Sequence, residues 1–330
     1  MPGLQQEADD ASVGQQDAVR LRPAAAGTGS EVVEDAIACT RVTKRFGALL
    51  AVSNLSLSVA PGEVVGFLGP NGAGKTTTIR MLLGFLNPTS GSCAVLGADL
   101  RRDPGLRRRI GYLPGDFRMD PGMTGKDLFT WFGRIRGGVN RARVAELVQR
   151  LHLDSSRPFA ALSKGNRQKI GIVQAFQHDP EVLILDEPTT GLDPLIQREF
   201  LDLIREAAGR GAAILFSSHV LPEVERAASR VAIIRAGELV TASTVDDLLD
   251  RTRHRLELRF ARPVPGQLFD GVPGVVAAEV DRRTAVITID GPAGPAMEAA
   301  VAGPGLLRVS SASDDLEDLF VGLYESGREE

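Results

Sequence analysis

The segment Gly69–Thr76, with the sequence GPNGAGKT, constrains the fold of this chain more than any other stretch. It fits G-x-x-x-x-G-K-[ST], the Walker A phosphate loop. Apolar, β-prone residues at 63–68 predict a strand before it, and apolar residues at helical spacing over 77–86 predict a helix after it. The glycines let backbone N–H groups turn towards phosphate oxygens, and the helix N-terminus adds the positive end of its dipole. The alternative, a glycine-rich turn with an exposed lysine, is disfavoured by the two flanking elements. The segment therefore predicts a nucleoside triphosphate site.

Side chains in and after this loop predict what happens to the nucleotide. Lys75 is expected to neutralise charge on the β- and γ-phosphates, and the Thr76 hydroxyl to ligate Mg²⁺. The apolar run at 182–185 predicts a central parallel strand that ends in Asp186 and Glu187. A carboxylate at Asp186 can reach Mg²⁺ across the loop, and Glu187 can orient and deprotonate an attacking water. An Asp-Glu pair after a strand is a weak signal alone, but about 110 residues after a Walker A motif it predicts ATP hydrolysis.

Strands and helices alternate from the phosphate loop onwards, which predicts an α/β fold with a largely parallel sheet. Residues 43–47, between the first two predicted strands, are expected to form a turn. The predicted strands lie at 37–42, 51–59, 63–68, 93–96, 110–113, 182–185, 212–216, 231–234 and 238–241, and the predicted helices at 77–86, 124–153 and 196–208.

Two stretches of this region have a structural and a functional interpretation. The basic residues of 100–109 favour a solvated face over a phosphate- or partner-binding surface. Thr124 and Asp127 fit a capping box at the start of a helix. The helix carries an apolar stripe that includes Trp131, which we expect in the core rather than stacked on a ligand; the other members are Leu128, Phe132 and Ile135.

The ends of the chain differ from its centre. Residues 1–35 hold seven acidic residues against two arginines and no periodicity, which predicts a disordered acidic tail. We expect the nucleotide-binding domain at 36–245 and a separate accessory α+β domain at 250–330. The latter has strands predicted near 256–260, 275–280, 285–290 and 306–309, and helices at 296–301 and 314–324. This order, with a short helix after the first strand, is compatible with a ferredoxin-like split βαβ unit. It contains no catalytic constellation, so a regulatory or dimer-stabilising role is favoured.

Composition excludes several classes of protein. The chain has 330 residues, 43% hydrophobic and 24% charged, as in ordinary globular proteins. Its net charge of −4 argues weakly against a dedicated nucleic-acid binder. Cys39 and Cys93 form neither a disulfide scaffold nor a metal motif, so a reducing cytosol is expected. No stretch approaches 18 apolar residues and no secretion signal is present, so a membrane role requires a partner chain.

Three more motifs accompany the phosphate loop and the Asp-Glu strand. They are LSKGN at 162–166, TGLD at 190–193, and Ser218-His219 after the strand at 212–216. In this order and spacing the set resembles an ATP-binding-cassette (ABC) ATPase over residues 36–245. The resemblance implies a P-loop NTPase with a RecA-like parallel core, an antiparallel β subdomain and a helical subdomain at about 115–175. It also implies two cassettes that close face to face around two ATP molecules.

The resemblance assigns roles to matching residues. Glu187 would be the catalytic base and His219 would reach the γ-phosphate, although a lone histidine is more often structural. Thr76 would ligate Mg²⁺, and Asp186 would be a direct or second-sphere carboxylate of the metal. Ser163 and Gly165 would contact the γ-phosphate of ATP on the opposite subunit, with Asp193 at the dimer seam. The nucleotide cradle would comprise Phe46, stacked on adenine, with Gly69, Pro70, Asn71, Gly72, Ala73, Gly74, Lys75, Thr76 and Thr77.

Two departures from the family pattern stand out. Gly115 replaces an expected glutamine, and only the neighbouring Asp116 could substitute for it. The LSKGN segment replaces Leu-Ser-Gly-Gly-Gln but keeps Ser163 and Gly165. With the C-terminal appendage, this variant resembles ATPase subunits of ABC-2-type exporters, of the antibiotic-resistance kind similar to daunorubicin/doxorubicin exporters.

Three functions are therefore compared. The favoured one is an ATPase that powers efflux of a drug or another hydrophobic molecule through a separate ABC-2-type permease. It would work at the cytoplasmic face of the plasma membrane, as a homodimer or as a heterodimer with a related ATPase, with no nucleic acid. A cassette ATPase acting on nucleic acid or ribosomes is disfavoured because the chain has no coiled-coil insertion, zinc cysteines or second cassette. A non-catalytic cassette is disfavoured because Lys75, Asp186, Glu187 and His219 are all present.

Overall fold

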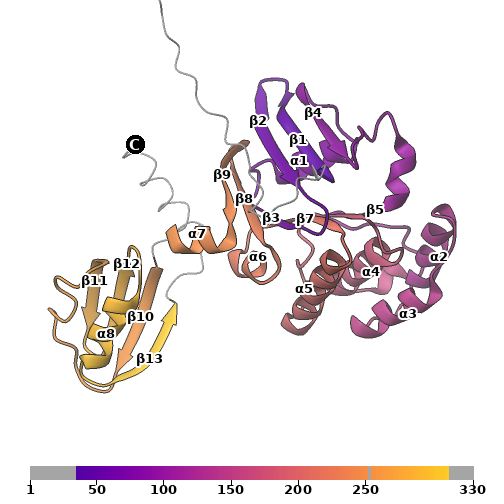
Figure 1. Cartoon of the computed structure of the whole chain (residues 1–330). Coiled ribbons are helices and arrows are strands. Elements are labelled where there is room, and N and C mark those ends of the chain that lie inside the picture. Colours follow the sequence, from indigo (N-terminus) through magenta and orange to yellow (C-terminus); the bar gives the residue numbers. More distant parts are fainter. Residues whose placement is uncertain (1–34, 252–253, 312–330) are drawn as a thin grey trace, which may run out of the picture.

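The computed structural model describes residues 35–251 and 254–311, and its centre is a six-stranded sheet in the order β5-β6-β7-β3-β8-β9 (Figure 1). The strands are β3 (Val64–Leu68), β5 (Ile110–Leu113), β6 (Val182–Leu185), β7 (Ala213–Ser218), β8 (Arg230–Arg235) and β9 (Glu238–Thr244). All are parallel except β9, which pairs antiparallel with β8. Every residue of β3, β6 and β7 is buried, as expected for parallel strands covered on both faces. Since β6, β7 and β3 are neighbours, the segments that follow them meet at one edge of the sheet.

A smaller antiparallel sheet, in the order β2-β1-β4, contributes with α1 (Lys75–Leu82) to the core on one face of the central sheet. Its strands are β1 (Ile37–Phe46), β2 (Leu49–Val59) and β4 (Ser90–Val95). The turn predicted at 43–47 is wrong for residues 43–46, because β1 continues to Phe46, which pairs with Leu49. The register shifts between Cys39 and Arg45 allow polar residues to stay in the ladder, which local propensity does not reveal.

The other face of the central sheet is covered by helices. α5 (Pro194–Gly209) buries Phe200, Leu203 and Ile204 against the sheet, and α4 (Lys164–Phe176) lies beside it (Figure 1). The remaining helices of this region are α2 (Gly125–Ile135), α3 (Arg141–Arg150), α6 (Leu221–Ala227) and α7 (Val245–Arg251).

The single helix predicted at 124–153 is two helices. The capping box is confirmed, because the Thr124 Oγ1 atom accepts from the Asp127 amide and the Asp127 carboxylate accepts from the Thr124 amide. Gly137 and Gly138 have positive φ angles and end α2, and Asn140 then caps α3.

The expectation that Trp131 belongs to the core is wrong, since it is 54% exposed. The face of α2 that packs inward carries Leu128 and Phe129, with Phe132 partly buried beside them. Trp131 instead lies edge-on against Phe132, and Ile135 of the same predicted stripe is 48% exposed. The apolar stripe of α2 is wider than the surface that packs against the core, so the residues at the edge of the stripe remain exposed to solvent.

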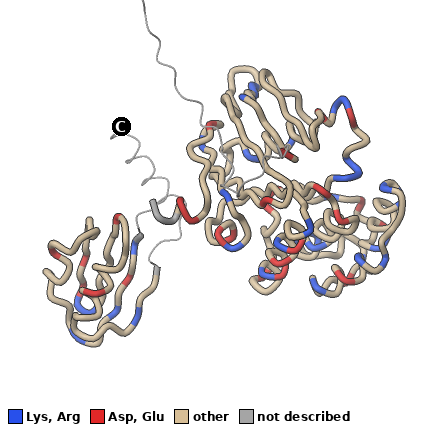
Figure 2. Tube along the Cα trace, viewed as in Figure 1, with Lys and Arg blue, Asp and Glu red and all other residues tan. Residues whose placement is uncertain are grey.

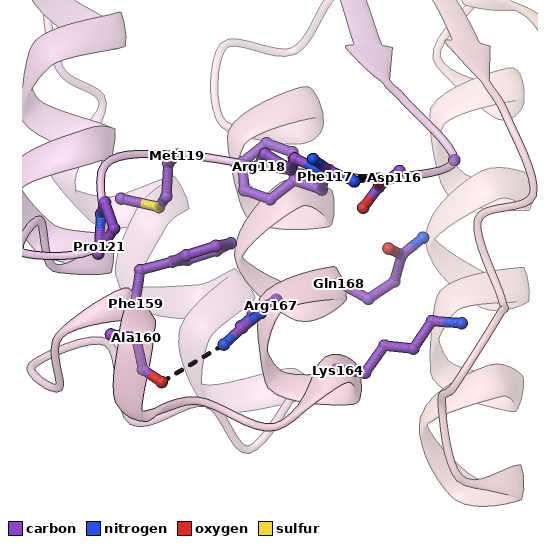
Figure 3. Close-up of a pocket in the computed structure, with 11 residues that line it drawn as sticks. Asp116, Phe117, Arg118, Met119, Pro121, Phe159, Ala160, Lys164, Arg167 and Gln168 are labelled. Carbon is purple, nitrogen blue, oxygen red and sulfur yellow. Dashed lines mark hydrogen bonds and ion pairs between the residues drawn. The ribbon is translucent and has the colours of Figure 1, made fainter.

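A cavity of about 650 Å³ separates the start of α4 from the segment that follows β5 (Figure 3). Phe159 is central to its lining, with Phe117 at a ring distance of 6.0 Å and the Arg167 guanidinium 4.9 Å from its ring centre. Phe159 belongs to a short 3₁₀ helix, Phe159–Ala161, just before the LSKGN segment.

The basic segment at 100–109 contains another 3₁₀ helix, Pro104–Arg109, and its charged side chains are exposed. Figure 2 shows the basic positions along this part of the backbone. Arg101 is paired with Asp99 and Arg109 with Glu181. Among the described residues, no helix has the length and apolar character needed to cross a membrane.

The C-terminal part is a four-stranded antiparallel sheet in the order β11-β12-β10-β13, with α8 (Gly294–Ala302) packed on it. Its strands are β10 (His254–Phe260), β11 (Val275–Asp281), β12 (Thr284–Ile289) and β13 (Leu306–Ser311). The predicted strands and helix of this part are confirmed, except that residues 261–274 form turns and no helix. The predicted helix at 314–324 and nearly all of the predicted tail at 1–35 lie outside the described residues.

Candidate active site

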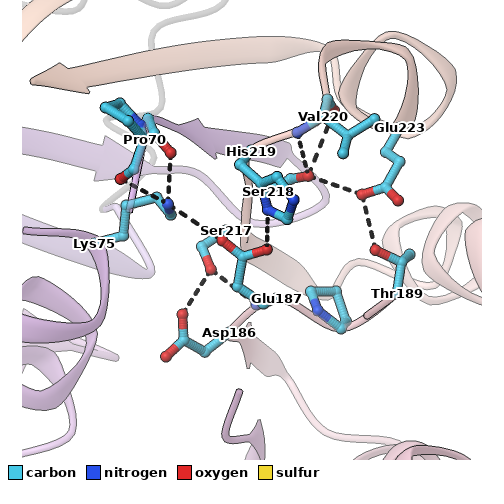
Figure 4. A network of polar contacts seen from close by, with 12 residues as sticks. Pro70, Lys75, Asp186, Glu187, Thr189, Ser217, Ser218, His219, Val220 and Glu223 are labelled. Carbon is cyan, nitrogen blue, oxygen red and sulfur yellow. Dashed lines mark hydrogen bonds and ion pairs between the residues drawn. The ribbon is translucent and has the colours of Figure 1, made fainter. Parts of the chain in front are cut away.

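The phosphate loop joins β3 to α1, as predicted, and the Lys75 side chain folds back to bond the backbone of the loop. The Lys75 Nζ atom donates to the carbonyl oxygens of Gly69, at 2.5 Å, and Pro70, at 3.2 Å (Figure 4). Gly74 precedes α1 with φ +112°, and a Cβ atom there would lie 2.7 Å from the Ala51 carbonyl oxygen. The loop therefore needs glycine at this position for both its backbone angle and its close packing.

Asp186 lies at the end of β6 and is almost fully buried. Its Oδ2 atom accepts from the Thr76 hydroxyl at 2.8 Å, and its Oδ1 atom accepts from the Ser217 hydroxyl at 2.7 Å. Burial, and to a lesser extent the nearby Asp186 charge, raises the pKa of Tyr112 to about 12. The predicted pair Thr76 and Asp186 thus presents hydroxyl and carboxylate oxygens at one point.

Glu187 links the phosphate loop to His219. Its Oε1 atom lies 3.2 Å from the Lys75 Nζ atom, and its Oε2 atom lies 2.7 Å from the His219 Nδ1 atom (Figure 4). The Lys75 and Glu187 side chains are only 6% and 19% exposed. Glu187 has φ +47°, a left-handed backbone that costs about 1–3 kcal/mol in a residue other than glycine. This turn is what lets consecutive carboxylates, which would point apart in a strand, both reach the site.

A cavity of about 470 Å³ opens in front of the loop. Phe46, at the end of β1 and 45% exposed, lines it together with residues 70–77 and Glu187. The Lys44 ammonium lies 4.9 Å from the centre of the Phe46 ring. The structure therefore brings the predicted adenine-stacking residue and the predicted phosphate cradle into one cavity.

Ser163, Gly165 and Asp193 do not line this cavity. Ser163 caps α4 by accepting from the Asn166 amide at 3.3 Å, and Asp193 caps α5 through two backbone amides. A Cβ atom at Gly165 would lie 2.5 Å from the Gly191 carbonyl oxygen, so the start of α4 packs closely on the segment before α5. The two caps are exposed, and neither lines the nucleotide cavity of its own chain.

Four polar residues of the network were not predicted from the sequence. Ser217 bonds Asp186 and also accepts from the Glu187 amide at 2.9 Å. The buried Gln168 donates to the Pro188 carbonyl oxygen at 2.9 Å, and more weakly to that of Glu187. One Glu223 oxygen accepts from the hydroxyls of Thr189 and Ser218, each at 2.8 Å (Figure 4). Ser217 and Glu223 lie close to His219 in the sequence, and this proximity is the signal from which their place in the network could have been predicted.

Gly115 lies against Asp186, where a Cβ atom would be 3.4 Å from the Asp186 carbonyl oxygen and 3.6 Å from its Oδ2 atom. These are ordinary contact distances, so the position has room for a side chain. The neighbouring Asp116 is 72% exposed, and its carboxylate accepts from Arg118 (Figure 3). This hydrogen bond is the main cause that lowers the pKa of Asp116.

Comparison with known proteins decides the family. The model of the ABC transporter family matches residues 52–190. The Nod factor export ATP-binding protein I of Burkholderia pseudomallei (strain 1710b) is 34% identical over 296 residues, covering 88% of this chain and 96% of that protein. The bacitracin transport ATP-binding protein of Bacillus licheniformis is 34% identical over 310 residues, covering 88% and 98%. This chain belongs to the ABC transporter ATP-binding proteins. It is an ABC ATPase, and it hydrolyses ATP.

Solved structures agree with this family fold. The structure of an ATP-binding subunit of an ABC transporter superimposes with a TM-score of 0.61 at 30% identity, covering 64% of this chain and 91% of that one. A dimeric bacterial ABC transporter cassette superimposes with a TM-score of 0.56 at 22% identity, covering 63% and 98%. The predicted cassette fold, with its antiparallel β subdomain, is therefore confirmed.

Proposed function

We propose that this ABC ATPase powers efflux of a drug or another hydrophobic molecule through a separate ABC-2-type permease. The single observation that carries the ATPase part is the network joining Lys75, Glu187 and His219 at the ends of three neighbouring strands. Export is supported by the two relatives, which are named for Nod factor export and bacitracin transport. The finer resemblance to daunorubicin/doxorubicin exporters belongs to the same proposal.

Hydrolysis would begin with a change of partner at Lys75. In the chain alone its ammonium neutralises Glu187 across 3.2 Å. A triphosphate in the cavity places more negative charge beside the same ammonium, so Lys75 turns to the phosphates. Glu187 is then free to accept a proton from the attacking water, while His219 holds its other oxygen or the γ-phosphate.

Thr76 and Asp186 fit the proposed Mg²⁺, because their oxygens already lie 2.8 Å apart beside the loop. Magnesium is commonly held by one or two carboxylates together with substrate phosphates and water. When bound, it would neutralise charge that develops on the phosphates. Ser217 would keep the Asp186 carboxylate oriented towards it.

The site would be completed by a second cassette. Ser163 and Gly165 lie at the exposed N-terminus of α4, outside the cavity of their own chain, so their contact with a γ-phosphate requires another copy or a related ATPase. Asp193 would lie at the seam. We further propose that the assembly sits on the cytoplasmic face of the plasma membrane through its permease.

The domain division is part of the proposal. We place an acidic tail at 1–35, the cassette at 36–245 with its helical subdomain at about 115–175, and an accessory domain at 250–330. The strand order β11-β12-β10-β13 supports a ferredoxin-like arrangement for the last, although turns replace its first helix.

The test is to isolate the tagged chain from membranes of its own cells and identify what co-purifies. We expect a multi-span membrane protein, and ATPase activity of the reconstituted pair that rises with particular hydrophobic compounds. A Glu187→Gln chain purified in the same way is the control, since it should retain the membrane protein without the activity. Recovery of ribosomes or DNA in place of a membrane protein would contradict the proposal.

A further inference from the structure

The C-terminal sheet carries an arginine cluster that the ATPase cycle does not use. Four arginines from three different segments line one cavity of about 920 Å³. They are Arg259 on β10, Arg282 and Arg283 in the turn between β11 and β12, and Arg308 on β13. Figure 2 shows basic positions gathered at the end of this sheet that lies away from α7.

The strand register places part of this cluster in one row. Asp281 pairs with Thr284, Thr284 with Arg259, and Arg259 with Arg308, so the four lie side by side across the sheet. Their neighbours Phe260 and Ala285 are buried in the core beneath α8, so the row faces the opposite side.

Like charges directly opposite each other on neighbouring strands are destabilising. Arg259 and Arg308 are such a pair, and within the described residues no ion pair joins either of them, or Arg282 or Arg283, to a carboxylate. Arg255 on the same strand contrasts with them, since it lies 4.0 Å from Glu279. Among the cavity's lining residues only Asp281 opposes the four positive charges.

We propose that this cavity binds a phosphate-bearing anion. Guanidinium groups present planar pairs of N–H donors that match phosphate oxygens, and the Thr284 hydroxyl adds another donor. A bound phosphate removes the repulsion between Arg259 and Arg308, which gives the chain a reason to hold four unpaired arginines together. The phosphate belongs either to the headgroup of an anionic phospholipid or to a small soluble polyphosphate. The proposal is independent of which molecule the exporter transports.

The experiment uses the full chain with saturating MgADP, so that the phosphate loop is already occupied. Binding is measured by co-sedimentation with phosphatidylcholine vesicles, with and without phosphatidylglycerol, and by calorimetric titration with pyrophosphate. The test variant is Arg259→Gln/Arg308→Gln. The matched control is Arg255→Gln/Arg262→Gln, which removes two charges from the same sheet and its adjoining turn without touching the cavity lining.

We expect the test variant to weaken binding about 10-fold or more, and the control to change it less than about 2-fold. Binding to phosphatidylglycerol vesicles alone identifies a lipid headgroup, and binding of pyrophosphate identifies a soluble phosphate. ATPase activity should stay unchanged in both variants, which separates this test from that of the export proposal. If the double variant does not fold, the single variant Arg308→Gln on the edge strand β13 replaces it, and the same loss of phosphate binding is expected.

The proposal is wrong if neither phosphate probe binds the wild-type chain. It is equally wrong if the control weakens binding as much as the test variant, because net charge alone would then explain the effect. Binding of an oligonucleotide without either phosphate probe would also overturn it.

Discussion

Two surfaces of the cassette carry predicted nucleotide contacts, and they differ in how complete they are. At the carboxyl ends of β3, β6 and β7, the side chains of Lys75, Asp186 and Glu187 all have partners within the chain. At the N-termini of α4 and α5, the side chains of Ser163 and Asp193 bond, among the described residues, only the backbone of their own helices. The first surface has its proposed catalytic groups paired within one chain, whereas the second is a pair of exposed helix caps that, in the proposed dimer, would meet a nucleotide held by another chain.

The difference has a simple cause. Neighbouring parallel strands bring their ends together wherever the sheet forms, so the first surface follows from the sheet itself. A helix N-terminus offers amides to an anion but does not bring the anion with it. Three substitutions on these surfaces, taken from the largest expected effect to the smallest, can break or sharpen this comparison, and a fourth, on neither surface, has the smallest effect.

Glu187→Gln should produce the largest loss, because it removes the proposed base but keeps the shape of the side chain. We expect kcat to fall about 10²–10⁴-fold while ATP affinity is retained, measured by phosphate release and by equilibrium nucleotide binding. Glu181→Gln, an exposed carboxylate just before β6, is the control. A Glu187→Gln chain with near wild-type turnover would show that the first surface does not use this base.

Lys75→Ala should weaken ATP binding about 10–100-fold, since charge-assisted bonds to phosphate are lost. Titration with a fluorescent ATP analogue measures the effect, and Lys126→Ala on the exposed side of α2 is the control. Unchanged affinity would mean that the phosphates bind away from the Walker A segment.

Ser163→Ala tests the incomplete surface. Hydrolysis should fall about 10-fold with little change in the ATP affinity of the isolated chain, because the hydroxyl serves the opposite subunit. Thr124→Ala removes a comparable helix cap on α2, so it reproduces the loss of stability alone. Equal ATPase activities of the Ser163→Ala and Thr124→Ala variants would mean that Ser163 acts only as a helix cap.

The smallest effect concerns His178, which follows the far end of α4. Burial, with a smaller contribution from Arg136, lowers the pKa of His178 to about 4. The unfolded chain therefore binds a proton at a higher pH than the folded chain does, and the free energy of unfolding falls as the pH drops from about 6.5 towards 4. We expect His178→Gln to reduce this loss by about 1–2 kcal/mol between pH 7 and pH 5, measured by urea denaturation. His152→Gln, which replaces an exposed histidine, is the matched control; equal pH dependence in both variants would contradict the assignment.

The central sheet and the phosphate loop could be predicted because their signals are local. β5 and β6 match the predicted strands residue for residue, since short continuous apolar runs bounded by turns leave little choice. The extension of β1 to Phe46 and the exposure of Trp131 could not be predicted. Both depend on contacts with residues far away in the sequence. The polar residues of β1 do not reveal locally that they pair with β2, and the residues at the edge of the α2 stripe do not reveal locally that they stay exposed.

By itself the sequence determined the cassette fold and predicted which residues would carry out hydrolysis, because the Walker A pattern, the Asp-Glu strand and their spacing permit few other arrangements. Only the tertiary structure decided how these residues meet. The left-handed backbone at Glu187 turns its carboxylate towards Lys75 and His219, and pairing of distant strands places four arginines around one cavity. Such contacts join residues far apart in the chain, and their geometry is set by packing that no single segment contains.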